Sequence, residues 1–302
     1  MGRFRSPQSQ AKHALKQRLA IGKSSHGEGR NDGKIHSLGT SRTYSDSLKG
    51  VADFIAERQL DPMGKGLASL NRNAALAYLE FRCQEVGQKQ LDKDRQAIQA
   101  ILEEKLPAIQ SELDQVLQSR AYTQQQILLV AGAQSPKHSL ASLIAADAGL
   151  RAHELLTLLP VRVRSPSAHR VWTDERFQGR ENIVLYTVKG KGGLIREVAI
   201  DHELASKMEQ LRHSEPCRVT DRGIYYEQFY DIGGGKQWSD SFSKAAQRQL
   251  GWSAGGHGLR HTYAQKRMKA LQSQGYIYQR ALSIVSQEMG HFRPEITEVY
   301  LR

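Results

Sequence analysis

The sequence predicts an α+β protein of two domains, mainly helical, with a small antiparallel β-sheet in the second domain. At 302 residues, with 39% apolar side chains, the chain is long enough for two ordinary domains. Apolar residues recur at helical spacing through most of its length. Two runs of strand character, IVLYTV at 183–188 and IREVAI at 195–200, interrupt this helical pattern.

We expect residues 1–42 to form a flexible basic arm. They contain nine lysine and arginine side chains but only two acidic ones, Glu28 and Asp32, which gives this segment more than half of the net charge of +12. The segment is rich in Gly, Ser and Gln and has little apolar periodicity. A basic chain points to a polyanionic partner, with nucleic acid as the first candidate. A solvated tail without a function fits residues 1–42 equally well.

Residues 43–118 are expected to form a four-helix domain. The first helix is indicated by Tyr44, Leu48, Val51 and Ile55, which are spaced at i, i+4, i+7 and i+11. Three further amphipathic stretches follow it, marked by Leu76, Leu79 and Cys83, then by Leu91, Ile98 and Leu102, and after Pro107 by Ile109, Leu113, Val116 and Leu117.

Residues 122–302 are expected to form the second domain. Thr123 is placed to cap a helix, and SLASLIAADAG ends at Gly149, so that Arg151 starts the next helix, where the helix dipole attracts anions. The two strand-like runs are separated by KGKGGL, which predicts a β-hairpin. The rest of the chain is expected to be helical, with breaks at Gly251, Gly275 and Gly290 and a short helix after Pro294.

Several classes of protein are disfavoured. Cys83 and Cys217 form no CxxC pair, so the sequence indicates neither a disulfide framework nor a zinc ribbon. No apolar run reaches membrane-spanning length, and the first thirty residues lack a secretory hydrophobic region. We therefore expect a cytoplasmic protein.

The stretch GGHGLRHTYA at 255–264 is the first candidate site. His257, Arg260 and His261 are spaced at i, i+3 and i+4, which places them on one face of a helix. The catalytic zinc pattern has a glutamate where Gly258 stands, and Arg260 would repel a cation, so no metal is expected. A guanidinium fork beside imidazoles suits an anion. Taken alone, the motif fits a buried histidine beside a surface arginine equally well.

Three motifs together resemble the series found in the tyrosine recombinases, also called phage integrases. They are AGLRAHELLTL at 148–158, HGLRH at 257–261 and MGHFRPEITEVY at 289–300. The resemblance covers residues 122–302 and is looser over 43–118, which is similar to the core-binding domain of that family. The residues of these motifs are most similar to those of integrases from proteobacterial prophages and integrative elements. The order of functional residues in the family is filled here by Arg151, Lys191, His257, Arg260, His291 and Tyr300.

The resemblance implies a two-domain clamp around DNA, with a SAM-like helical core-binding domain and a tyrosine-recombinase catalytic domain. It implies a site-specific recombinase in which Tyr300 attacks a phosphodiester and forms a 3′-phosphotyrosyl link, without metal, ATP or another cofactor. Arg151 and Arg260 would stabilise negative charge on the nonbridging oxygens, and His257 and His291 would add hydrogen bonds. Because a free tyrosine with a pKa near 10 is only about one part in a thousand ionised at pH 7, His257 is the expected proton acceptor.

The remaining roles follow from the same alignment. Lys191 is expected to protonate the departing 5′ oxygen, and Lys189 is the alternative. Glu154 either orients Arg151 or forms an ordinary i, i+3 pair with it. His261 is expected to have a supporting, structural role.

Double-stranded DNA at a specific site is the implied partner, bound by a homotetramer on two paired sites, and an accessory DNA-bending protein is possible in such systems. DNA contacts are expected from Arg3, Arg5, Lys12, Lys16, Arg18, Arg42 and Arg196. Only two residues follow Tyr300, so assembly is expected to use surfaces other than a C-terminal helix, unless this chain lacks its native tail. The alternatives are a type IB topoisomerase and a noncatalytic DNA-binding protein with the same fold.

Overall fold

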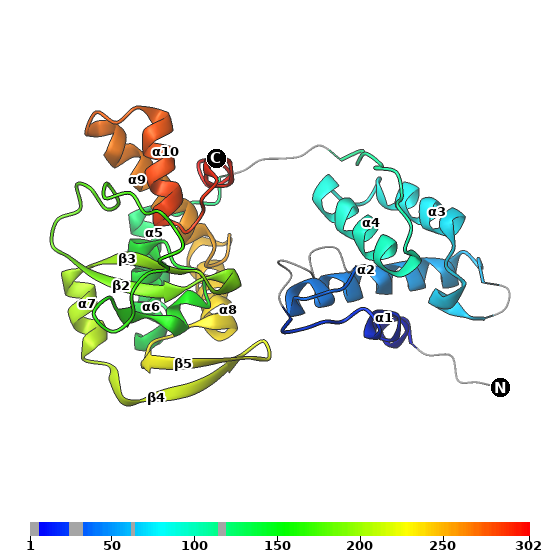
Figure 1. The fold of residues 1–302 in the computed structure, drawn as a ribbon, viewed down its shortest axis with the longest axis horizontal. Coiled ribbons are helices and arrows are strands. Elements are labelled where there is room, and N and C mark those ends of the chain that lie inside the picture. Colours follow the sequence, from blue (N-terminus) through cyan, green and yellow to red (C-terminus); the bar gives the residue numbers. More distant parts are fainter. Residues whose placement is uncertain (1–5, 24–32, 62–63, 114–118) are drawn as a thin grey trace. The chain divides into compact units, whose positions relative to one another are not determined.

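The computed structural model describes residues 6–23, 33–61, 64–113 and 119–302, and for Lys191 the backbone alone. The chain divides into two compact units, Met1–Val116 and Leu117–Arg302. The two units are coloured from blue to cyan and from green to red in Figure 1. In the part of the chain so described, no helix has the combination of length and apolar character needed to cross a bilayer.

The first unit is helical. It contains α1 (Pro7–Lys16), α2 (Leu38–Glu57), a 3₁₀ turn η2 (Gly66–Ser69), α3 (Arg72–Arg82) and α4 (Gln88–Leu102). Side-chain caps begin three of these helices, because Ser6 accepts from Ser9 N–H at α1, Ser37 from Thr40 N–H at α2 and Asn71 from Ala74 N–H at α3. The core of the unit is formed by Leu48, Val51, Ile55, Leu79, Leu91 and Ile98, all of them buried.

The expectation of a flexible arm over residues 1–42 is wrong where the structure describes them. Residues 7–16 form α1, whose Ala11 and Leu15 are 0% and 2% exposed in the same core as α2. A backbone bridge also pairs Leu19 with Ile35. Two apolar residues at i, i+4 are too weak a periodic signal for a helix, and it is packing against α2 that stabilises it. Residues 1–5, with Arg3 and Arg5, lie outside the described residues.

The helix expected after Pro107 does not form over residues 107–113, and Val116 and Leu117 lie outside the described residues. Helix α4 ends where Glu103 adopts a left-handed conformation, with φ of 59°. The following segment runs along the core in an irregular conformation, buries Leu106, and is held where Ser111 N–H donates to Gln88 Oε1 at 2.8 Å. Among the residues of the first unit that the structure describes, the fourth α-helix is α1, which precedes the region where four helices were expected.

The second unit contains α5 (Gln124–Gly132), α6 (Pro136–Ala148), a 3₁₀ turn η3 (Glu154–Thr157) and a three-stranded antiparallel sheet. Thr123 caps α5 through a reciprocal capping box with Gln126, as predicted. The sheet has the order β1 (Leu159–Pro160), β2 (Ile183–Lys189), β3 (Ile195–Asp201). The predicted hairpin is thus confirmed, and its loop contains a short turn, η4 (Lys191–Gly193).

The expectation that the chain is only helical after this hairpin is wrong. Helix α7 (His202–Glu209) is followed by a second hairpin of β4 (Arg212–Asp221) and β5 (Ile224–Tyr230). Its two-residue turn has φ of 51° at Arg222 and 75° at Gly223, the positive values that tight hairpin turns require. An arginine-glycine pair between two strands is a weaker turn signal than asparagine-glycine, so the local sequence does not predict this hairpin.

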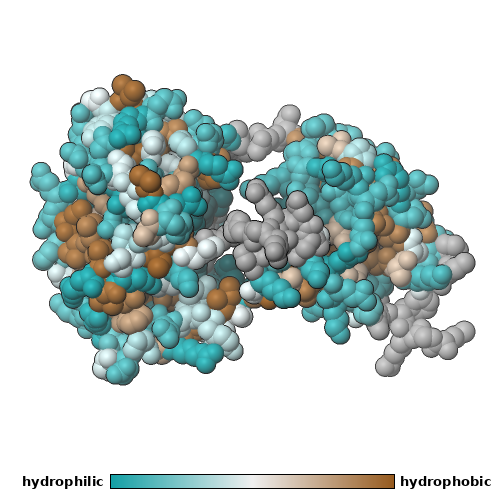
Figure 2. Space-filling view, viewed as in Figure 1, coloured by the Kyte–Doolittle hydropathy of each residue, from teal (hydrophilic) through white to brown (hydrophobic). Residues whose placement is uncertain are grey.

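The predicted glycine breaks are confirmed in the C-terminal helices. These are α8 (Gly235–Leu250), α9 (Gly258–Ser273), α10 (Tyr278–Glu288) and the short α11 (Pro294–Glu298). In Figure 1, α9 and α10 form a pair at one end of the unit, opposite the β4–β5 hairpin, and α6 crosses behind the sheet. The face in Figure 2 is mainly hydrophilic, with apolar side chains in separate patches.

Candidate active site

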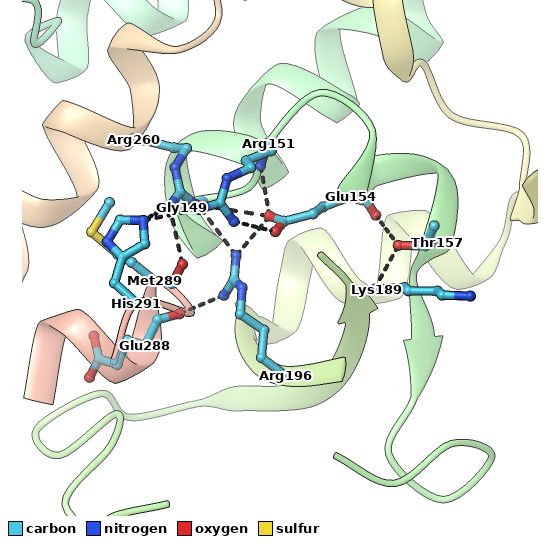
Figure 3. A network of polar contacts seen from close by, with 10 residues as sticks. All are labelled: Gly149, Arg151, Glu154, Thr157, Lys189, Arg196, Arg260, Glu288, Met289 and His291. Carbon is cyan, nitrogen blue, oxygen red and sulfur yellow. Dashed lines mark hydrogen bonds and ion pairs between the residues drawn. The ribbon is translucent and has the colours of Figure 1, made fainter. Parts of the chain in front are cut away.

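Two arginines approach each other at the C-terminal end of α6. Gly149 ends that helix with φ of 61°, a left-handed conformation that brings its carbonyl toward α9. Arg260 is fully buried on α9 and donates to this carbonyl, and its Nη2 donates to Met289 O at 3.1 Å. Arg151 follows Gly149 by two residues and is a quarter exposed. The cap that ends α6 therefore also organises the cluster in Figure 3.

A single buried carboxylate balances this cluster. Glu154 is 0% exposed, with Oε1 at 2.7 Å from Arg151 Nη1 and Oε2 at 2.8 Å from Arg196 Nη2 and 3.9 Å from Arg260 Nη1. Burial acts to raise the pKa of Glu154, but the charges of Arg196, Arg151 and Arg260 together hold that pKa far below its ordinary range. Glu154 is therefore ionised and surrounded by guanidinium groups, which is more than an i, i+3 surface pair.

The expectation that Arg151 starts a helix, whose dipole would attract anions, is wrong. The segment after Arg151 is a 3₁₀ turn of four residues, Glu154–Thr157, which is too short to carry an appreciable macrodipole. The N–H of Arg151 instead donates to Glu154 Oε2 at 2.8 Å. A carboxylate, rather than a helix end, orients this arginine.

His291 contacts both arginines. Its Nε2 lies 2.9 Å from Arg151 Nη2 and 3.3 Å from Arg260 Nη2, and its Nδ1 lies 3.1 Å from Thr297 Oγ1. Because guanidinium groups can only donate, Nε2 must accept, and the ring proton is assigned to Nδ1. Burial, followed by the charges of Arg260 and Arg151, lowers the pKa of His291 to about 3. His291 is therefore neutral near pH 7.

Tyr300 lies among three imidazole rings. It is 8% exposed, with its ring centroid 5.3 Å from that of His257, 4.8 Å from His261 and 5.4 Å from His291. The Arg260 guanidinium lies 5.4 Å from the same ring centroid. The structure thus brings Arg151, His257, Arg260, His291 and Tyr300 of one chain together.

His257 and His261 lie one turn apart at the start of α9. His257 is exposed, whereas His261 is 5% exposed and its Nδ1 has no hydrogen-bond partner within the described residues. The pKa of each ring is lowered to about 4, and desolvation by burial is the largest cause. The second cause is the charge of Arg260 for His257 and the charge of Arg120 for His261. Near neutral pH both rings are therefore uncharged.

The lysine loop is joined to this cluster through Thr157. The backbone N–H of Lys189 donates to Thr157 Oγ1 at 2.9 Å, and that hydroxyl donates to Glu154 O at 2.9 Å. Figure 3 shows the exposed side chain of Lys189 directed away from the arginines. The Lys191 side chain lies outside the described structure, so its expected role stays a prediction.

The expectation that Arg196 contacts DNA is corrected by its burial. Its side chain is 1% exposed, and besides Glu154 it bonds the carbonyls of Glu288, at 2.5 Å, and Gly149, at 3.3 Å. In the first unit, Arg18 forms an ion pair with Glu103. The other expected DNA contacts that the structure describes are exposed, and they are Lys12, Lys16 and Arg42.

Residues that sequence reasoning missed complete the site. Thr297 fixes the His291 ring, and Gln265 Nε2 donates to Tyr300 O at 3.3 Å. Gln265 is spaced at i+8 from His257 on α9, so helical periodicity was the available signal. A metal-ligand set of three or more His, Cys, Asp or Glu side chains does not occur within the described ranges.

Comparison with models of protein families gives no match, and a search of curated protein sequences also gives none. Among solved structures, the XerH site-specific recombinase bound to palindromic difH substrate is 13% identical, with a TM-score of 0.55 over 98% of this chain and 90% of that one. A lambda integrase dimer bound to a COC′ core site is 15% identical, with a TM-score of 0.54 over 98% and 76%. The Tn1549 transposon integrase in complex with transposon right end DNA is 11% identical, with a TM-score of 0.52 over 99% and 95%. The chain therefore has the α+β fold of the tyrosine recombinases, as its motifs predicted.

Proposed function

We propose that this protein is a site-specific DNA recombinase that cuts and rejoins strands through a covalent 3′-phosphotyrosyl link to Tyr300. The observation that carries the proposal is the position of this tyrosine, 4.8–5.4 Å from three imidazole rings and from the buried Arg260 guanidinium. A nucleophile, neutral bases and fixed cations thus meet in one place. The fold shared with DNA-bound recombinases supports the same conclusion.

The charge of the site suits a phosphodiester. Three guanidinium groups surround one carboxylate, Glu154, and His257 and His291 are neutral, so this cluster has a net charge of +2. The Nε atoms of Arg196 and Arg260 are also buried without a hydrogen-bond partner in the described part of the chain. An attacked phosphodiester gains negative charge on its nonbridging oxygens, so preorganised cations stabilise the transition state more than the substrate.

The proposed reaction exchanges one phosphate ester bond for another. The Tyr300 oxygen forms a bond to phosphorus while the bond from phosphorus to the 5′ oxygen breaks, and rejoining reverses these changes. The phenolic proton passes to a neutral imidazole, for which His257 is proposed because its ring contacts Tyr300 and remains exposed. Lys191 is proposed to protonate the 5′ oxygen. No cofactor is needed, because the phosphotyrosyl ester retains the energy of the broken bond.

Nicked duplexes containing a randomised central sequence would test this proposal and identify the site together. Cleavage beside a nick releases a short fragment and traps the protein on DNA, so adducts that resist SDS can be recovered and sequenced. We expect adducts from the wild-type chain and none from Tyr300→Phe. The control is Tyr225→Phe, on the exposed strand β5, where Tyr225 is 64% exposed. Equal trapping by Tyr300→Phe would exclude Tyr300 as nucleophile.

The same experiment separates the alternatives. Adducts without a recovered consensus, together with relaxation of supercoiled plasmid, would overturn recombination in favour of a type IB topoisomerase. Binding without any adduct would indicate a noncatalytic DNA-binding protein. Assembly as a tetramer on two paired sites is proposed by analogy with the lambda integrase tetramer bound to a Holliday junction, and light scattering of the complex would test it.

A further inference from the structure

We propose that Gln265 is a positioning residue that holds the backbone of Tyr300 against α9, and that His261, one turn earlier on the same helix, holds the ring of Tyr300. The inference rests on the proposed function for its effect on cleavage, but its structural part can be tested in the absence of DNA. The seat consists of His257, His261 and Gln265, spaced at i, i+4 and i+8 along one face of α9.

The amide of Gln265 contacts two carbonyls of the C-terminal segment. Its Nε2 donates to Tyr300 O at 3.3 Å and to Arg302 O at 3.1 Å, using both hydrogens of one NH₂ group. The ring of His261 packs against the ring of the same residue, Tyr300, with 4.8 Å between their centroids. Helix α9 therefore binds Tyr300 by both its backbone and its side chain.

The local secondary structure of this segment gives its backbone little support, although the ring of Tyr300 is buried in the core of α9 and α10. Helix α11 has only five residues, Pro294–Glu298, and a helix this short is unstable by itself. After it, Tyr300 N–H donates to Thr297 O at 2.9 Å and Leu301 N–H donates to Glu298 O at 3.0 Å, while the carbonyls of a helix end require outside donors. Gln265 supplies such a donor at the residue proposed to attack DNA.

A cavity borders the segment at Leu301, the residue that follows Tyr300. It has a volume of about 660 Å³, and its lining includes Gln265, Gln272 and Leu301. Tyr300 is a buried member of the α9–α10 core, and Leu301 packs against that core. Loss of the two amide bonds would allow the Tyr300 hydroxyl to sample positions away from the arginines, which slows a reaction that depends on alignment.

Two substitutions separate the loss of the hydrogen-bond donors from a change in side-chain shape. Gln265→Glu keeps the shape but removes the donors and places negative oxygens against two carbonyls. Gln265→Lys changes the shape but keeps a donor of similar reach. Gln272→Glu is the matched control, because this exposed glutamine lies on the same helix beside the same cavity and undergoes the same change of charge.

Hydrogen exchange of DNA-free protein gives the first result. We expect the peptide covering residues 296–302 to exchange faster in Gln265→Glu than in wild type, and near the wild-type rate in Gln265→Lys and Gln272→Glu. Unchanged exchange in Gln265→Glu would overturn the seat. Because this measurement needs no DNA, it stands even if the wild-type chain forms no adduct and the proposed function fails.

Single-turnover cleavage of a duplex recovered from the randomised pool gives the second result. We expect the cleavage rate of Gln265→Glu to fall by about 10- to 100-fold with DNA affinity unchanged, and Gln265→Lys to recover most of the loss. Wild-type cleavage by Gln265→Glu, or equal loss in the glutamate and lysine variants, would overturn the positioning role. Loss of DNA affinity in parallel with rate would overturn it as well.

Discussion

At the scale of single residues, the site depends on one buried carboxylate. Glu154 binds Arg151 and Arg196 directly and lies 3.9 Å from Arg260, so that it holds three like charges within one small volume. Without it, the repulsion among three guanidinium groups would have no local compensation. The sequence spacing of Arg151 and Glu154 predicted only the first of these contacts.

Glu154→Gln is therefore expected to lower the free energy of unfolding at pH 7 by about 3–5 kcal/mol, the range seen when one partner of a buried ion pair is removed. Because the folded-state pKa of Glu154 is depressed, its contribution is fully present above the unfolded-state pKa of about 4.5 and is lost as pH falls. Urea denaturation between pH 3 and 7 should show the difference from wild type shrinking below that value. Glu203→Gln, on the exposed side of α7, is the control, and a pH-independent difference would contradict the assignment.

The histidines of the site are expected to remain neutral at pH values well below the pKa of a free imidazole, 6.5. In DNA-free protein, NMR titration of the ring carbons should place the pKa of His257 at about 4 and that of His291 at about 3. Both folded-state values lie below the unfolded value of 6.5, so the unfolded chain takes up more protons and stability declines as pH falls below 6.5. Titration of either ring near 6.5 would exclude its proposed environment.

At the scale of elements, the ends of helices and strands hold the site together. The cap of α6 supplies the carbonyl of Gly149 to Arg260, and Thr157 at the end of η3 connects Glu154 to the last residue of β2. These are contacts between elements distant in sequence, made by the groups that secondary structure leaves unpaired.

Gly149→Ala tests the first of these junctions. Its φ of 61° strains any L-residue, and an added Cβ would lie 2.6 Å from Cδ1 of the buried Tyr263. Gly251→Ala is the matched control, because it ends α8 with φ of 75° but meets nothing within 4 Å. We expect about 1 kcal/mol of destabilisation for the control and clearly more for Gly149→Ala. Equal melting temperatures for the two variants would contradict the close packing against Tyr263.

Thr157→Val tests the second junction. The substitution keeps the shape but leaves the Lys189 N–H and the Glu154 carbonyl without their partner, at a cost of about 1–3 kcal/mol. We expect faster hydrogen exchange of the 183–194 peptide, which contains the lysine loop, and slower DNA cleavage by this variant. Thr220→Val, on the exposed β4, serves as control, and unchanged exchange in Thr157→Val would show that the loop is held by other contacts.

At the scale of the whole molecule, the chain contains two units, each with its own buried core. The described residues that converge on Tyr300 belong to the second unit, residues 117–302. The exposed cations expected to contact DNA from the first 42 residues belong to the first unit. Chemistry and part of the DNA affinity are therefore expected to be separable.

A fragment of residues 117–302 is expected to unfold cooperatively and to bind DNA more weakly than the full chain. Its affinity should also depend less on salt, by a slope of about 0.9 for each phosphate contact that is lost. Calorimetry and binding measured from 50 to 300 mM salt would test both points. Failure of the fragment to fold would show that the second unit needs the first for its stability. An unchanged salt slope would show that the first unit contributes no phosphate contacts.

The local pattern of the sequence determined much of this protein. The Thr123 cap, the β2–β3 hairpin and the breaks at Gly251, Gly275 and Gly290 follow from short-range steric and hydrogen-bonding preferences, and the structure has each of them. Helix α1 and the β4–β5 hairpin were missed because their local signals are weak.

Only the tertiary structure decided which polar groups meet. Arg196 was expected at the DNA and is instead buried against Glu154, and Gln265 became visible only when Tyr300 was folded back onto α9. These contacts join residues 35 to 42 positions apart. The periodicity of a sequence predicts which face of a helix or strand is apolar. It does not predict the neighbours of a polar side chain, because these depend on how whole elements pack and on which charged groups are desolvated together.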